Sequence, residues 1–127
     1  MPHVIVHYSA NLDRLDPDAL LAAINRALLD SGEFRALAIK SRAMRLDHFR
    51  VGESGPDHGF VHASLKILPG RPLALRQAIA ASVLAAMQAA TARHELHCQF
   101  CVELEMLDAD TYTKAEIDGR PAPEPVP

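Results

Sequence analysis

Tryptophan is absent from this chain, and aromatic residues make up only 5% of its 127 residues. A core must therefore be built from aliphatic side chains, which are plentiful because 49% of the residues are hydrophobic. The length suits one domain with one main core.

Cysteine, clustered positive charge and long apolar runs are also scarce. Two cysteines do not indicate a disulfide framework, so we expect a reducing, cytoplasmic setting. The formal net charge is -3 and the basic residues form no run, which argues against a nucleic-acid or polyanion binder. No segment approaches the ~18 consecutive apolar residues of a membrane span. The start of the chain lacks the basic stretch and apolar region of a secretory signal.

Hydrophobic spacing divides the chain into two similar halves, at about residues 2–56 and 57–107. Each half has the order strand, helix, strand, which predicts an α/β (α+β) fold with a four-stranded, mostly parallel sheet and two helices on one face. The first half has strands at 4–8 and about 38–46, around a helix that begins at Asp16 and Pro17 and ends near Gly32. The second half has strands at 60–67 and about 97–107, around a helix that begins at Pro72, has Leu73 on its apolar face and ends near Arg93 or His94.

One face of this sheet is left without a helix. Because that face is still partly apolar, an oligomer is the economical way to cover it. The chain becomes polar from Thr111, so we expect a single domain over residues 1–118. Alternating prolines cannot pair regularly in a sheet, and the tail at 119–127 is expected to be extended or disordered.

Pro2 is the first candidate for chemistry. Methionine aminopeptidase removes Met1 before a small residue such as proline, which leaves a secondary amine at the start of the first strand. An α-amino group has an ordinary pKa near ~8, so desolvation or a nearby cation brings that pKa close to neutrality. A general acid–base catalyst works best in that range. Many ordinary proteins also begin with Met-Pro, so Pro2 alone does not establish catalysis.

Lys40, Arg42 and Arg71 are candidates for binding carboxylates. Lys40 and Arg42 lie two apart on an alternating strand and therefore share a face. Arg71 lies in a turn at the head of the second helix, where backbone N–H groups add positive potential. Together the three cations suit a substrate with several carboxylates. Each one taken alone is more simply a solvated surface charge.

Histidine and cysteine give weaker signals. His62 shares a strand face with Phe60 and Ser64, where it either contacts substrate or has a structural role. Cys98 and Cys101 lie three apart on a strand and face opposite sides, so we expect neither a shared metal nor a redox pair. The spacing from His94 to His97 is not that of a zinc protease motif. We therefore expect no metal site.

Several segments then combine into one pattern. Met1, Pro2 and His3 lead straight into an apolar strand, and residues 39–42, 57–62, 65–67, 70–71 and 76–77 follow in order. This pattern resembles the 5-carboxymethyl-2-hydroxymuconate isomerase family of the tautomerase superfamily, most specifically over residues 60–77. The resemblance covers about residues 2–107. It implies a tandem β-α-β tautomerase fold, a homotrimer, and a small di- or tricarboxylate as substrate.

The resemblance also implies an activity that needs no cofactor. The family isomerises 5-carboxymethyl-2-hydroxymuconate in the bacterial breakdown of homoprotocatechuate, with the amino-terminal proline as base and then acid. Two arginines of the family bind the carboxylates, and they fall on position 40 and on Arg71. Position 40 is Lys40 here, which keeps the charge but loses the bidentate fork, so either Arg42 takes over or the substrate differs. The alternatives are hydration, dehalogenation or decarboxylation of an unsaturated acid by the same proline, and a non-catalytic trimeric binding protein.

Overall fold

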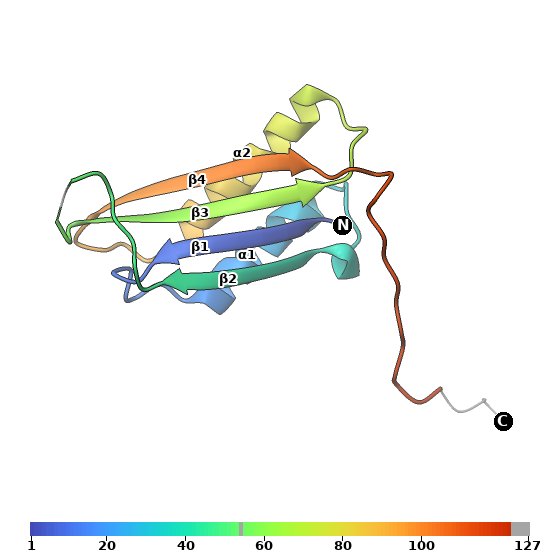
Figure 1. Ribbon diagram of the computed structural model, residues 1–127, viewed down its shortest axis with the longest axis horizontal. Helices are drawn as coiled ribbons and strands as arrows, with labels where there is room; N and C mark the ends of the chain where they lie inside the picture. Colours follow the sequence, from blue (N-terminus) through green and yellow to red (C-terminus); the bar gives the residue numbers. More distant parts are fainter. Residues whose placement is uncertain (54, 123–127) are drawn as a thin grey trace.

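A four-stranded mixed sheet forms the centre of the computed structural model, which describes residues 1–53 and 55–122 (Figure 1). The strands are β1 (His3–Ser9), β2 (Lys40–Leu46), β3 (His58–Ile67) and β4 (His97–Met106), in the spatial order β2-β1-β3-β4. Strand β1 is parallel to β2, β3 is parallel to β4, and β1 and β3 join the two pairs through an antiparallel pairing. The predicted pair of β-α-β halves and the mostly parallel sheet are confirmed.

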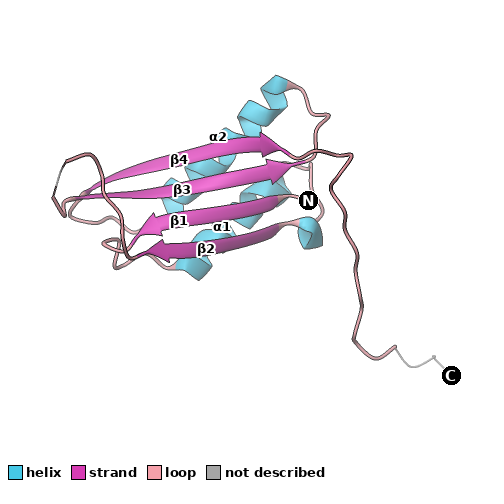
Figure 2. Ribbon diagram, in the orientation of Figure 1, coloured by secondary structure: helices cyan, strands magenta, loops and turns pink. Residues whose placement is uncertain are grey.

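Both helices, α1 (Pro17–Asp30) and α2 (Leu73–Ala90), cover the same face of the sheet (Figure 2). Each helix connects two parallel strands, as in other crossover units. The core lies between these two layers, and burial alternates along the whole of β3. On β3 the inward residues, Val61, Ala63, Leu65 and Ile67, are fully buried.

The start of α1 follows the sequence prediction. The Asp16 carboxylate accepts hydrogen bonds from the backbone N–H groups of Asp18 (3.0 Å) and Ala19 (3.2 Å), and Pro17 is the first helical residue. After the helix, Gly32 adopts φ 77°, which glycine accepts without steric cost. The chain then turns toward the beginning of β2, beside the amino end of β1.

The second helix differs from its prediction at both ends. It ends at Ala90 instead of Arg93 or His94, because Thr91 takes an extended backbone with φ −90° and ψ 122°. The His94 side chain instead accepts a hydrogen bond from the backbone of Arg14 at 3.0 Å. The assignment of Leu73 to the buried face is wrong, since this first helical residue is 57% exposed.

Strand β2 is shorter than predicted. It begins at Lys40 and not near Ala38, because Ala36–Ala38 form a 3₁₀ turn, η1, before the strand. The Ile39 N–H donates to the Ala36 carbonyl at 3.3 Å, which closes the turn. Strand β3 is longer than predicted, because His58 already pairs with His97.

Helix α2 is unusually apolar. Its 18 residues have a mean hydropathy of 1.3, enough by length and composition alone to cross a membrane. Here it lies against α1 and β4, with Ile79, Val83 and Met87 buried in the core. This packing is that of a covering helix in an α/β layer.

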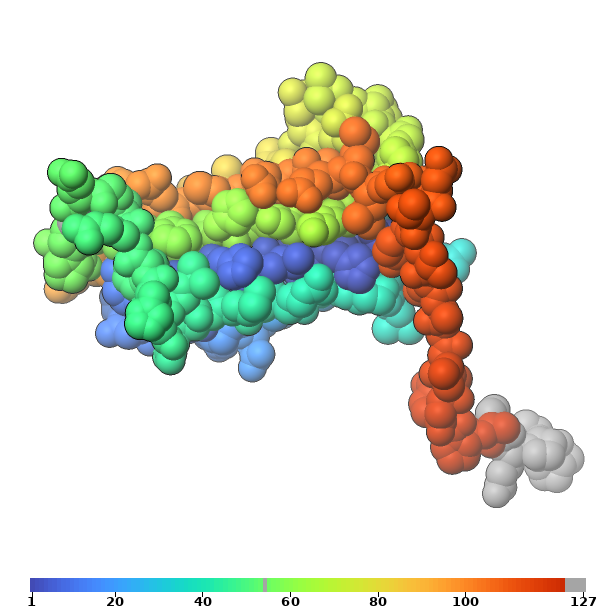
Figure 3. All heavy atoms as spheres, in the orientation of Figure 1, coloured from blue at the N-terminus to red at the C-terminus, as the bar shows by residue number. Residues whose placement is uncertain are grey.

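In residues 1–53 and 55–122 no helix lies over the opposite face of the sheet, here called the outer face (Figures 2 and 3). It carries the side chains that alternate with the core residues, among them Ile5, Phe60 and Met44, which is 45% exposed. Beyond β4 the chain runs past the amino end of β1 and then away from the sheet (Figure 1). Of the predicted tail at 119–127, residues 119–122 have no regular structure and 123–127 lie outside the described residues.

Candidate active site

Pro2 lies at the amino end of β1, in the middle of the sheet. It is buried, and its carbonyl accepts a hydrogen bond from the Lys40 backbone N–H at 3.0 Å. Its neighbour His3 is paired with Lys40 on one side and Lys66 on the other. The first residues of the chain are therefore held from both sides by neighbouring strands.

The environment of the chain's amino group disfavours its protonated form. Burial is the main cause that lowers the pKa of the amino group at Met1, and the charges of Lys40 and Lys114 lower it further. The pKa of His3 is lowered as well, first by burial and then by four cationic groups. In decreasing order these are Arg42, Lys40, the amino group and Lys66. This end of the sheet is thus a positively charged setting that favours uncharged amines.

Lys40 and Arg42 share the outer face, as predicted. Lys40 is opposite His3 and Arg42 is opposite Ile5, so both project beside the start of β1. The Lys40 ammonium donates to the Ala38 carbonyl at 2.9 Å, which holds it near η1. Lys66 adds a third cation on the other side of β1, and sequence reasoning did not count it among the binding residues.

Arg71 is held by Glu33 and Phe34. Its Nε lies 3.0 Å from Glu33 Oε1, its Nη2 donates to the Glu33 carbonyl at 3.2 Å, and its Cζ lies 4.6 Å from the Phe34 ring centroid. Glu33 and Phe34 precede β2, whereas Arg71 follows β3. Since β1 lies between these two strands, Arg71 links the segments that border the amino end of β1. Its Nη1 takes no part in these bonds.

Tyr112 was missed by sequence reasoning. Its hydroxyl lies 3.1 Å from His3 Nε2, and the two rings meet edge to face with centroids 6.1 Å apart. Two residues on, Lys114 forms an ion pair with Glu116 at 2.8 Å. The polar sequence after Thr111 gave no periodic signal, so only tertiary structure shows that this segment reaches the amino end of β1 (Figure 3).

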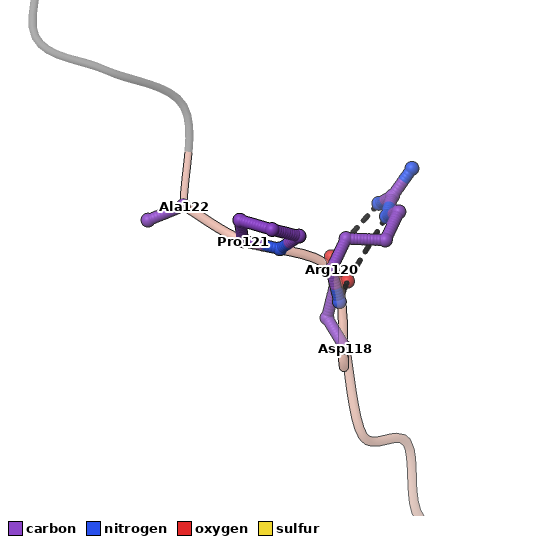
Figure 4. A pocket seen from close by; sticks show the side chains of 4 residues that line it. All are labelled: Asp118, Arg120, Pro121 and Ala122. Atoms are coloured by element: carbon purple, nitrogen blue, oxygen red, sulfur yellow. Dashed lines mark hydrogen bonds and ion pairs between the residues drawn. The ribbon is translucent and has the colours of Figure 1, made fainter.

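A hollow of about 400 Å³ lies between η1 and this segment. One of its lining residues, Ala38, accepts the hydrogen bond of the Lys40 ammonium. The lining residues are Arg35, Ala36, Leu37, Ala38, Lys114 and Glu116. A second hollow, drawn in Figure 4, is formed by tail residues 118–122, where Arg120 is paired with Asp118, and it contains none of the candidate residues.

The remaining candidates lie away from this end of the sheet. His62 pairs with His7 in the middle of the outer face and lies 3.7 Å from Glu103. Cys98 is partly buried and its pKa is raised by burial, whereas Cys101 is exposed on the other face. Among the residues that the structure describes, no three His, Cys, Asp or Glu side chains are grouped so that they could hold a metal ion.

Comparison with known proteins identifies related chains. The family profile of 5-carboxymethyl-2-hydroxymuconate isomerase matches residues 2–119. The 5-carboxymethyl-2-hydroxymuconate Delta-isomerase of Escherichia coli is 37% identical over 78 residues, which is 61% of this chain and 62% of that protein. The aligned region thus spans less than two thirds of that relative's length.

Solved structures share the fold. A 5-carboxymethyl-2-hydroxymuconate isomerase from Deinococcus radiodurans R1 superposes with a TM-score of 0.84 and 24% identity, over 91% of this chain and 90% of that chain. A fused 4-OT symmetric trimer superposes with a TM-score of 0.57 and 19% identity, over 82% of this chain and 85% of that chain. The profile match over nearly the whole chain and the shared tandem β-α-β architecture agree with the sequence resemblance. The chain belongs to the 5-carboxymethyl-2-hydroxymuconate isomerase family.

Proposed function

We propose that this protein is a cofactor-independent isomerase that moves a proton within an unsaturated 2-hydroxy or 2-oxo carboxylic acid, with Pro2 as the acid–base catalyst. The proposed substrate is 5-carboxymethyl-2-hydroxymuconate, as in the family. The proposed pathway is the breakdown of homoprotocatechuate, and the proposed compartment is the cytoplasm. The observation that carries the proposal is the buried Pro2 at a cationic strand end that lowers the pKa of the amino group.

Removal of Met1 moves the amine one residue inward. The nitrogen of Pro2 then lies deeper than the Met1 amino group and next to the backbone that pairs with Lys40. Burial and the nearby cations lower the pKa of the Met1 amino group, and we expect them to hold the pKa of the processed Pro2 amine below the ordinary ~8 of an α-amino group. A larger fraction of the enzyme therefore holds Pro2 as a free base at neutral pH.

The reaction needs only this one proton carrier. Pro2 nitrogen accepts the proton of the 2-hydroxyl group, the O–H electron pair forms the new C=O bond, and the C=C electrons shift along the conjugated chain. The Pro2 ammonium then donates its proton to the distal carbon, so the number of protons is conserved. Lys40 and Arg42 on the outer face, together with Arg71, hold the carboxylates and stabilise the negative oxygen that develops.

We further propose that the chain assembles as a homotrimer through the outer face. Ile5, Met44 and Phe60 leave apolar surface on that face, which association would remove from water. The symmetric trimer among the structural relatives has the same fold. Light scattering after gel filtration checks this: three times the 13.8 kDa chain mass is expected, and the mass of one chain would contradict it.

A panel of unsaturated acids tests the reaction type. We expect the ultraviolet absorbance of 5-carboxymethyl-2-hydroxymuconate to change with enzyme, whereas halogenated acrylates release no halide and 3-oxo acids release no carbon dioxide. Solvent deuterium should appear at a single carbon of the product, because one base carries the proton. Turnover of a halogenated or 3-oxo acid in place of the muconate would assign the same proline to dehalogenation or decarboxylation. Binding of these acids without turnover of any would indicate a non-catalytic protein.

A further inference from the structure

The C-terminal segment, residues 111–116, is attached to the strand that bears Pro2. The Tyr112 hydroxyl is bonded to His3 Nε2 at 3.1 Å, and the Tyr112 side chain is half-buried against His3. A turn precedes this contact, in which the N–H groups of Thr111 and Tyr112 donate to the Asp108 carbonyl. The turn and the hydroxyl contact together direct the segment back across the amino end of β1.

Lys114 lies two residues beyond this attachment and lines the 400 Å³ hollow. Its charge acts on the chain's amino group, whose pKa it lowers together with Lys40. Lys114 lies near the amino end of β1, because it follows Tyr112, which contacts His3, and lines the hollow beside η1. A hollow of this size is in the range that holds small ligands, and Arg35 contributes a second cationic side chain to it.

The present partner of Lys114 can be replaced. Glu116 pairs with Lys114 at 2.8 Å, but the Glu116 side chain is 78% exposed and pairs as a carboxylate. A substrate carboxylate has the same charge and geometry, so it can take the place of Glu116 and leave that side chain in water. Arg71, in contrast, is held by both an oxygen of the Glu33 side chain and the Glu33 backbone.

We propose that Lys114 binds a carboxylate of the substrate that is remote from the reacting carbons, and that Tyr112 is the positioning residue that holds the Lys114 segment against β1. The proposal rests on the proposed function, because Lys114 would give the Pro2 site its preference for acids with more than one carboxylate. The selectivity then comes from a segment outside the β-α-β repeats.

Lys114→Gln tests the binding step. We expect the KM for a dicarboxylate substrate to rise about fivefold with little change in kcat, since an exposed charge contact acts equally on ground state and transition state. A monocarboxylate analogue should show no such rise. Arg120→Gln is the matched control, because Arg120 pairs with Asp118 two residues away just as Lys114 pairs with Glu116 (Figure 4). Equal effects of the two variants, or none in Lys114→Gln, would overturn the proposal.

Tyr112→Phe tests the positioning step. It removes the hydroxyl that bonds to His3 and keeps the ring, so the fold is retained while the segment loses its attachment. We expect the same rise in KM for the dicarboxylate, and no further rise when Lys114→Gln is added. Glu116→Gln should lower that KM, because it removes the carboxylate that competes for Lys114. Additive effects of Tyr112→Phe and Lys114→Gln would refute the role of Tyr112.

A titration separates this proposal from the proposed function. In Met1-processed protein with ¹⁵N-labelled proline, Lys114→Gln should raise the pKa of the Pro2 amine, and Arg120→Gln should not, whether or not the enzyme turns over the muconate. A raised pKa without turnover would remove the named substrate and retain Lys114 beside the amine. An unchanged pKa in Lys114→Gln would remove Lys114 from the site even in an active enzyme.

Discussion

Arg71 makes the sharpest prediction about stability, because it combines three contacts in one place. Arg71→Ala removes an ion pair at 3.0 Å, a bond to the Glu33 carbonyl at 3.2 Å and the contact with Phe34 at 4.6 Å. Charged hydrogen bonds contribute ~1.5–3 kcal/mol and an exposed cation–π contact ~0.5–1 kcal/mol. The Arg71 and Glu33 side chains are 22% and 32% exposed, so water replaces part of what is lost.

We therefore expect Arg71→Ala to lower the free energy of unfolding by about 2 kcal/mol. Urea denaturation followed by far-ultraviolet circular dichroism measures this change, at one fixed protein concentration because assembly affects apparent stability. In a double-mutant cycle with Glu33→Ala, the coupling energy should be about 1 kcal/mol.

A matched ion pair provides the control. Arg26 pairs with Asp30 at 3.2 Å on α1, but these side chains are 71% and 61% exposed. Arg26→Ala should therefore cost only a few tenths of a kcal/mol, roughly the worth of an exposed i,i+4 pair. If Arg71→Ala were no more destabilising than Arg26→Ala, Arg71 would not link the segments that border β1, and its guanidinium would be free for substrate alone.

Three further predictions concern other parts of the fold. Gly59→Ala places a Cβ 2.8 Å from Ser9 Oγ and 2.9 Å from Asn11 Oδ1. We expect thermal unfolding to show that the free energy of unfolding falls by about 1–3 kcal/mol. A variant as stable as the wild type would contradict this packing. Asp16→Ala removes the cap of α1 and should cost ~1 kcal/mol in urea, whereas Asp16→Asn should restore most of it. The lowered pKa of His3 means that the unfolded chain takes up a proton near pH ~6.5 before the folded one does. Stability should therefore fall as the pH drops below ~6.5, and His3→Gln should reduce that slope; an unchanged slope would refute the assignment.

Much of the fold could be predicted because its local signals agree with its packing. The alternation along β3 matches a strand with one buried face, and Asp16 with Pro17 marks a helix start whose cap the structure contains. The boundaries near η1 and at Ala90 could not be predicted in the same way. They depend on a 3₁₀ turn and on a contact between His94 and Arg14, which lie 80 residues apart.

The placement of the candidate residues could be predicted only where they share a strand. Lys40 and Arg42 follow from alternation, and their placement beside Pro2 follows from the parallel pairing of β1 with β2. The partner of Arg71 could not be predicted, because Glu33 lies 38 residues away and no local pattern links the two. Tyr112 gave even less signal, since its contact with His3 spans 109 residues.

The most direct test of catalysis by Pro2 compares two forms of the same chain. The isomerisation of 5-carboxymethyl-2-hydroxymuconate is followed by ultraviolet absorbance, with Met1-processed protein beside protein that retains extra residues before Pro2. Catalysis by Pro2 predicts rapid turnover by the processed form and none by the blocked form, because only the first has a free Pro2 amine. Equal turnover by the two forms would contradict catalysis by Pro2, and absence of turnover in both would remove this substrate.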